Sequence, residues 1–156
     1  MKGDTDVISA LNELLTHELT AINQYYVHSK MCANWGYEAL AKKKMAEALE
    51  EMRHADELIE RILFLEGVPN MQRIGAVKVG EDAIEQHRLD LQLELVARDR
   101  LNRCIELFQK QGDNGSRLIA EKMLAEEEAA VDWLETQLSL VAELGKEHYL
   151  AQQMRG

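Results

Sequence analysis

The amino-acid sequence predicts an all-α protein: an up-down-down-up four-helix bundle with a long connection between the second and third helices and a short fifth helix at the end. Three observations favour this fold. Apolar residues recur at helical spacing, there is a single proline, and short segments rich in Gly and Asn separate the helical stretches. The length suits one domain with a sizeable core, so residues 1–156 are expected to form a single domain.

Two helical hairpins are expected. The predicted helices span approximately residues 5–33, 38–65, 81–111 and 116–144, and a short fifth helix follows from about residue 146. Asn34, Trp35 and Gly36 form the turn of the first hairpin, and residues 111–115 form that of the second. Gly145 ends the fourth helix.

The connection between the hairpins is long and contains the only proline, Pro69. Residues 67–80 can extend to roughly 45 Å, which matches the length of a helix of about 30 residues. The connection can therefore run the length of the bundle and make the second and third helices parallel. The alternative is a flexible linker between two separate hairpins, but neither hairpin could bury its apolar faces alone.

The net charge is −10. This charge argues against nucleic acid or an anionic membrane as a partner, and it suits a protein that attracts cations; an equally simple interpretation is that it keeps the protein soluble. Cys32 and Cys104 are expected to be free thiols in a reducing cytosol. No signal peptide is recognisable, and no apolar run approaches the ~20 residues of a membrane span, so a soluble cytoplasmic protein is expected.

Four glutamates occupy matched positions in the predicted helices. Glu18 and Glu51 are equidistant from the first turn, so they lie at one level of an antiparallel hairpin. Glu94 and Glu127 are related in the same way to the second turn, and the same sequence offset relates one pair to the other. Glu51 also begins a Glu-x-x-His motif that places His54 on the same helical face. The two halves look like one duplicated hairpin.

Each of these glutamates continues an apolar stripe of its helix. On the first helix, Leu15 lies one turn before Glu18 on the same face. On the third helix, the stripe contains Leu91, Glu94, Leu101 and Ile105. Four unpaired anions in a core would be very costly, so they are protonated or hold cations, unless one or two rotate to solvent. Two divalent ions would neutralise four carboxylates, and oxygen ligands with one imidazole suit iron, with manganese or zinc as competitors.

The sequence resembles the bacterioferritins, the haem-binding members of the ferritin family. The resemblance covers essentially the whole chain. A glutamate from each of two helices, with Glu-x-x-His from the others, is the ferritin-like di-iron pattern. The strings that carry the resemblance are Met1-Lys2-Gly3-Asp4, Ala21-Ile22-Asn23-Gln24-Tyr25, Glu51-Met52-Arg53-His54-Ala55-Asp56, Ile59-Glu60-Arg61-Ile62-Leu63-Phe64-Leu65-Glu66-Gly67 and Asp132-Trp133-Leu134-Glu135-Thr136.

The resemblance implies an iron-storing ferroxidase. It implies a di-iron site that oxidises Fe(II) with O₂ or peroxide. The residues that would be both catalytic and metal ligands are Glu18, Glu51, His54, Glu94 and Glu127. A shell of 24 subunits, built from two-fold dimers, would store the Fe(III) mineral. Haem b would conduct electrons for reductive release, with a reductant such as a ferredoxin as partner.

One ligand of the family pattern is missing. The second Glu-x-x-His motif should end at position 130, where this chain has Ala130. One iron ion is therefore expected to be well held and the other weakly held, with water or Glu47 as a substitute ligand. The alternative is a haem-bearing structural subunit with an impaired site, which joins a second bacterioferritin subunit in a mixed cage. A di-iron oxygenase or rubrerythrin-like peroxidase is a weaker alternative, because no Cys-x-x-Cys tail exists.

Met52 is the candidate haem ligand. It lies about 100° around the helix from Glu51, on a second apolar stripe with Met45, Leu49 and Ile59. A helix pair with two apolar faces favours a partner subunit, and a residue near a two-fold axis meets its own copy. Periodicity alone favours an ordinary packing methionine. The resemblance implies instead that Met52 and its copy bind haem through their thioether sulfurs.

Overall fold

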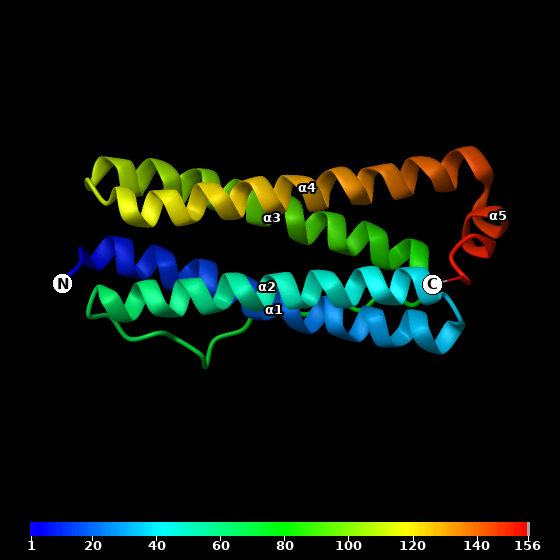
Figure 1. Ribbon diagram of the computed structural model, residues 1–156, viewed down its shortest axis with the longest axis horizontal. Helices are drawn as coiled ribbons and strands as arrows, with labels where there is room; N and C mark the ends of the chain where they lie inside the picture. The colour runs from blue at the N-terminus through cyan, green and yellow to red at the C-terminus, as the bar shows by residue number, and fades with distance from the viewer. Residues whose placement is uncertain (156) are drawn as a thin grey trace.

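A computed structural model describes residues 1–155. It confirms the predicted fold class: four long helices form an up-down-down-up bundle, and a short fifth helix closes one end (Figure 1). The helices are α1 (Thr5–Trp35), α2 (Glu38–Phe64), α3 (Ala83–Lys110), α4 (Asn114–Leu144) and α5 (Lys146–Ala151). No helix among residues 1–155 combines the length and apolar character needed to cross a bilayer.

Specific caps set the ends of the helices. The Asp4 carboxylate accepts hydrogen bonds from the first backbone N–H groups of α1. Gly36 ends α1 with a φ of 89°, a left-handed conformation that favours glycine. Asp113 caps α4 and forms an ion pair of 2.7 Å with Arg61 of α2. α1 is two residues longer than expected, and α3 begins two residues later because Asp82 is its N-cap.

The two hairpins α1–α2 and α3–α4 pack against each other around a core of aliphatic side chains. α2 and α3 run in the same direction, as the long connection requires (Figure 1). The predicted core stripe of α3 is partly wrong: Leu91 is only half-buried and lies outside the core, whereas Ile105 is partly buried and packs against it. The buried stripe instead passes through His87 and Asp90, because a polar network fills this part of the core.

The connection, residues 65–82 and here called the crossover, is fixed to α1 by side chains that accept its backbone N–H groups. Asn12 binds the N–H of residue 70 at 2.8 Å, and Thr20 binds that of residue 75 at 2.8 Å. Gln24 and His28 bind the N–H groups of residues 78 and 80 at 3.2 and 3.0 Å. These four residues lie on one face of α1. The crossover is therefore an ordered, extended segment and not a flexible linker.

A charged network is buried where α5 closes the bundle. Lys44 forms an ion pair with Asp90, which also accepts hydrogen bonds from Gln24 and contacts His28. Lys44, Asp90 and His28 are fully buried. Burial alone would raise the pKa of Asp90, but Lys44 and His28 lower it to about 2. The network reaches α5 through His87, whose Nε2 lies 2.8 Å from the hydroxyl of Tyr149.

Candidate metal centre

The carboxylate cluster, defined as Glu18, Glu51, His54, Glu94 and Glu127, lies midway along the bundle. α1 contributes Glu18, α2 contributes Glu51 and His54, α3 contributes Glu94 and α4 contributes Glu127. All five side chains are at least nine-tenths buried. The predicted convergence of acidic groups from four helices is thus present in the structure.

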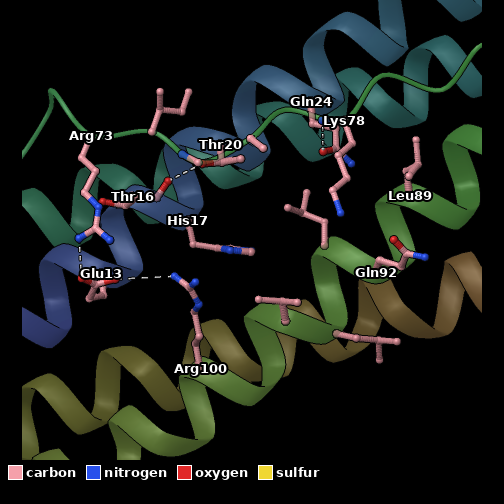
Figure 2. Close-up of a pocket in the computed structure, with 16 residues that line it drawn as sticks. Glu13, Thr16, His17, Thr20, Gln24, Arg73, Lys78, Leu89, Gln92 and Arg100 are labelled. Atoms are coloured by element: carbon pink, nitrogen blue, oxygen red, sulfur yellow. Dashed lines mark hydrogen bonds and ion pairs between the residues drawn. The ribbon is translucent and has the colours of Figure 1, made fainter.

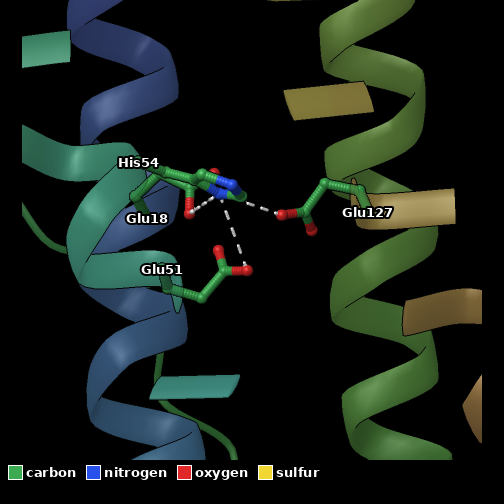
Figure 3. Close-up of side chains that lie close together, drawn as sticks. All are labelled: Glu18, Glu51, His54 and Glu127. Carbon is green, nitrogen blue, oxygen red and sulfur yellow. Dashed lines mark ion pairs between the residues drawn. The ribbon is translucent and has the colours of Figure 1, made fainter. Parts of the chain in front are cut away.

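Four of these residues can share one ion. One ligand atom each from Glu18, Glu51, His54 and Glu127 lies within 4.8 Å of the others. His54 is central, and Figure 3 shows the carboxylates turned towards its ring. The distances from His54 Nδ1 to the nearest carboxylate oxygens are 3.3 Å for Glu127, 3.6 Å for Glu18 and 3.8 Å for Glu51.

Glu94 lies beside this group and is oriented by Tyr25. The Tyr25 hydroxyl donates a hydrogen bond of 2.6 Å to one carboxylate oxygen of Glu94. The other oxygen has no partner, and burial followed by the charge of Glu127 raises the pKa of Glu94 well above its usual value. The sequence pattern does not predict this contact, because helical spacing does not show which hydroxyl meets which acid.

The cluster has the unsatisfied ligand atoms that a metal site requires. Nearly all buried polar atoms in proteins have hydrogen-bond partners. Among residues 1–155, Nδ1 of His54 has none, and each of the four glutamates has one oxygen without a partner. A metal ion accepts electron pairs from carboxylate oxygens and from an imidazole nitrogen, so it satisfies all these atoms at once. The residues therefore fit divalent cations.

Burial makes these carboxyl groups weak acids in the absence of metal. Burial, and then the nearby charge of Glu127, raises the pKa of Glu18 to about 7, although Glu51 and His54 oppose the shift. Burial and the charge of Glu51 raise the pKa of Glu127 to about 7. Burial alone would lower the pKa of His54, but the surrounding carboxylates of Glu127, Glu18 and Glu51 raise it. Protons therefore take the place of metal ions at low pH.

We expect the metal-free protein to lose stability as the pH rises from about 5 to about 8. Between the ordinary pKa of 4.5 and the folded value of about 7, Glu18 and Glu127 hold protons that the unfolded chain has released. The folded state binds more protons in this window, so stability falls with rising pH. Thermal unfolding of chelator-treated protein across this range measures the effect. Increasing stability over the window would contradict it, and added Co(II) should restore stability at the upper end.

Comparisons with known proteins assign the family. The family model of the ferritin-like domain matches residues 8–144. A bacterioferritin of Mycobacterium leprae is 49% identical over 152 residues, which cover 97% of this chain and 96% of that protein. Bacterioferritin BfrA of Mycobacterium tuberculosis shows the same identity and coverage. The chain belongs to the bacterioferritin family. A bacterioferritin of Streptomyces coelicolor is 48% identical over 151 residues, covering 97% of this chain and 90% of the relative.

Position 130 departs from the bacterioferritin pattern. Ala130 is buried on α4, three residues after Glu127, and it offers a methyl group where the pattern has an imidazole. Glu47, the predicted substitute ligand, forms an ion pair of 3.0 Å with Lys43 and is not in the group around His54. Its charge nevertheless contributes to the raised pKa of Glu94.

Two further acids meet His54 on its other side. Glu126 contacts Nε2 of the His54 ring, and Glu50 completes a second group of potential ligands there. Glu126 is not among the ligands predicted from the sequence, although the run Glu126-Glu127-Glu128 places it beside one of them. A carboxylate on the second nitrogen of a ligating histidine fixes the ring and makes it a stronger ligand.

Met52, the candidate haem ligand of this bacterioferritin-family chain, lies on the surface. Its side chain is 54% exposed. Leu49, one turn earlier on α2, and Tyr26 of α1 are also half-exposed. Large apolar side chains gathered on a surface are typical of interaction sites.

Proposed function

We propose that the protein stores iron as a bacterioferritin: it oxidises Fe(II) at the carboxylate cluster and keeps Fe(III) as a mineral inside a shell of 24 single-domain subunits assembled from two-fold dimers. The observation that carries this proposal is the set of five buried, unpartnered ligand atoms supplied by four helices. Membership of the bacterioferritin family supports it. The two free thiols, Cys32 and Cys104, suit a cytoplasmic protein.

The ligands would bind Fe(II) as the substrate. Two Fe(II) ions balance the four carboxylates, and the carboxyl groups release their protons as the ions bind. Glu126 would hold the His54 ring with Nδ1 towards the ions, and Tyr25 would hold one oxygen of Glu94 and leave the other free. Electrons pass from Fe(II) to O₂ or peroxide. The side chains around the cluster exclude bulk water, which strengthens each electrostatic contact.

The two iron positions are unequal in this proposal, because Ala130 supplies no ligand. In rapid mixing with O₂, we expect about one Fe(II) per chain to oxidise quickly, since a position that lacks its nitrogen ligand binds iron weakly. Ala130→His should raise the fast phase to about two Fe(II) per chain. Ala129→His, at the exposed neighbouring position, is the matched control. A fast phase of two Fe(II) in the unaltered protein would rule out the unequal site.

A second candidate function follows from the same residue. The chain would supply haem and shell to a mixed cage, while a second bacterioferritin subunit with a complete site oxidises iron. The buried methyl group of Ala130 favours this alternative. Purifying the chain alone separates the two: cages that oxidise Fe(II) support the first function, whereas cages that bind haem but do not oxidise Fe(II) support the second.

Haem b would bind between two subunits through Met52 of each. Haem supplies one-electron transfer, which suits reductive release of stored iron with a reductant such as a ferredoxin. The exposed apolar surface formed by Tyr26, Leu49 and Met52 would cover the haem faces and close the dimer.

Met52→Leu should therefore abolish haem binding and leave the dimer intact, because leucine keeps the apolar volume but has no sulfur to bind iron. Haem absorbance per subunit and the mass of the assembly measure the two effects. Met71→Leu, which changes another exposed methionine, is the control. Full haem content in Met52→Leu would show that the axial ligand lies elsewhere.

A further inference from the structure

A pocket with a cavity volume of about 580 Å³ lies outside the carboxylate cluster, between α1, the crossover and α3. Figure 2 shows His17 extending into it from α1, Arg100 from α3 and Lys78 from the crossover. The volume is within the range of pockets that bind small molecules. We call it the crossover pocket.

The pocket has an excess of positive charge in a strongly acidic chain. Arg73, Lys78 and Arg100 line it, whereas Glu13 is the only carboxylate among the lining residues within 1–155. Glu13 lies 2.7 Å from Arg73 and 3.9 Å from Arg100, so its charge is already shared. In the part of the chain that the structure describes, no ion pair joins Lys78 to a carboxylate. The pocket can therefore accept an anion without further rearrangement of charge.

His17 provides a buried polar group at the base of the pocket. Its side chain is only 7% exposed, and its ring lies between α1 and α3 on the side of Arg100 (Figure 2). Burial, and then the positive charge of Arg100, lowers the pKa of His17 to about 4. The imidazole is thus neutral, and its ring N–H is hydrogen-bonded to the backbone carbonyl of Leu93, so it adds no competing charge to the pocket.

The opposite part of the pocket is apolar. Leu89, Leu93 and Val96 of α3 line it together with Ile74 of the crossover. Val96 is 46% exposed and Ile74 is 49% exposed, although both side chains are large and aliphatic. A ligand that covers them removes apolar surface from water. An inorganic anion would leave this surface exposed.

We propose that the crossover pocket binds an organic monoanion with an aliphatic body, such as a medium-chain carboxylate. The carboxylate lies between Arg100 and Lys78, which supply the positive charge. The aliphatic body lies along Leu93 and Val96. Binding requires both the carboxylate and the aliphatic body of the ligand. The cationic side chains select for the negative charge, and the apolar surface of α3 selects for the aliphatic body.

Calorimetric titration of the assembled protein tests the proposal with three probes: octanoate, 1-octanol and inorganic phosphate. We expect octanoate to bind at about one site per chain, more tightly than either of the others. Arg100→Gln should weaken octanoate binding about tenfold, the usual effect of losing one hydrogen bond to a charged group. Val96→Glu should abolish binding, because it places a negative charge beside the aliphatic body.

Arg98→Gln is the matched control, since Arg98 lies on the same helix outside the pocket and pairs with Asp99. It should bind octanoate like the unaltered protein. Equal binding of 1-octanol would overturn the proposal, because charge would play no part. Equal binding of phosphate would overturn the aliphatic assignment. Octanoate binding that Val96→Glu and Arg100→Gln leave unchanged would place the site elsewhere.

Discussion

Replacing Glu127 with glutamine should destroy tight metal binding and at the same time stabilise the metal-free protein. Glutamine keeps the shape of the side chain but cannot supply an anionic oxygen to the ions. Even partners that only support metal ligands alter affinity by about 10- to 100-fold, so loss of a direct ligand should cost about 100-fold or more. Co(II) titration measures the affinity, and rapid mixing with Fe(II) and O₂ measures oxidation.

The gain in stability has the opposite sign because Glu127 is buried and its pKa is raised to about 7. At about pH 8 the unaltered side chain is ionised in the core beside other acids, and removing that buried charge is worth on the order of 3 kcal/mol. Glu128→Gln is the control, because Glu128 is exposed on the same helix. Retention of tight Co(II) binding by Glu127→Gln would show that the ions bind elsewhere.

Lys44→Met should lower the free energy of unfolding by about 3–5 kcal/mol, the usual effect of removing one partner from a buried ion pair. Lys44 and Asp90 are both fully buried. Without the lysine, the Asp90 carboxylate stays in the core with only His28 and Gln24 as partners. Urea and thermal unfolding at fixed protein concentration measure the loss.

Two further variants separate charge from packing in this experiment. Lys122→Met removes an exposed lysine that pairs with Glu57, and it should change stability by less than about 1 kcal/mol. The double variant Lys44→Met with Asp90→Leu removes both charges, so it should recover much of the loss. A double variant as unstable as Lys44→Met alone would show that lost packing, rather than an unpaired charge, causes the effect.

The fold and the metal ligands could be predicted because both depend on regular spacing. Helical periodicity and short turns define the hairpins, and equal distances from a turn place Glu18 beside Glu51 and Glu94 beside Glu127. A carboxylate on an apolar stripe has few physical explanations, so each such carboxylate is evidence for a buried ion pair, a proton or a metal ion. His54 followed from its spacing to Glu51.

The remaining features depend on which side chains meet across the bundle, and spacing along the chain does not determine that. Asp90 interrupts the stripe of α3 much as Glu94 does, but its partner Lys44 comes from another helix and makes it an ion pair. Glu126 reaches His54 because the ring exposes its second nitrogen on that side. The crossover pocket could not be predicted, because one of its walls is the crossover. The crossover is an irregular segment, and its sequence has no periodicity that would indicate its path.

The attachment of the crossover to α1 makes the two hairpins unequal. The sequence offset that relates the paired metal ligands also relates Thr20 to Val96 and Gln24 to Arg100. On the first hairpin these positions hold the connecting chain, and on the second they form a wall of the crossover pocket. A symmetric dimer of unlinked hairpins could bring together the same four carboxylates but could not enclose this pocket. Any ancestor of that kind would have gained the pocket only when the two copies became one polypeptide.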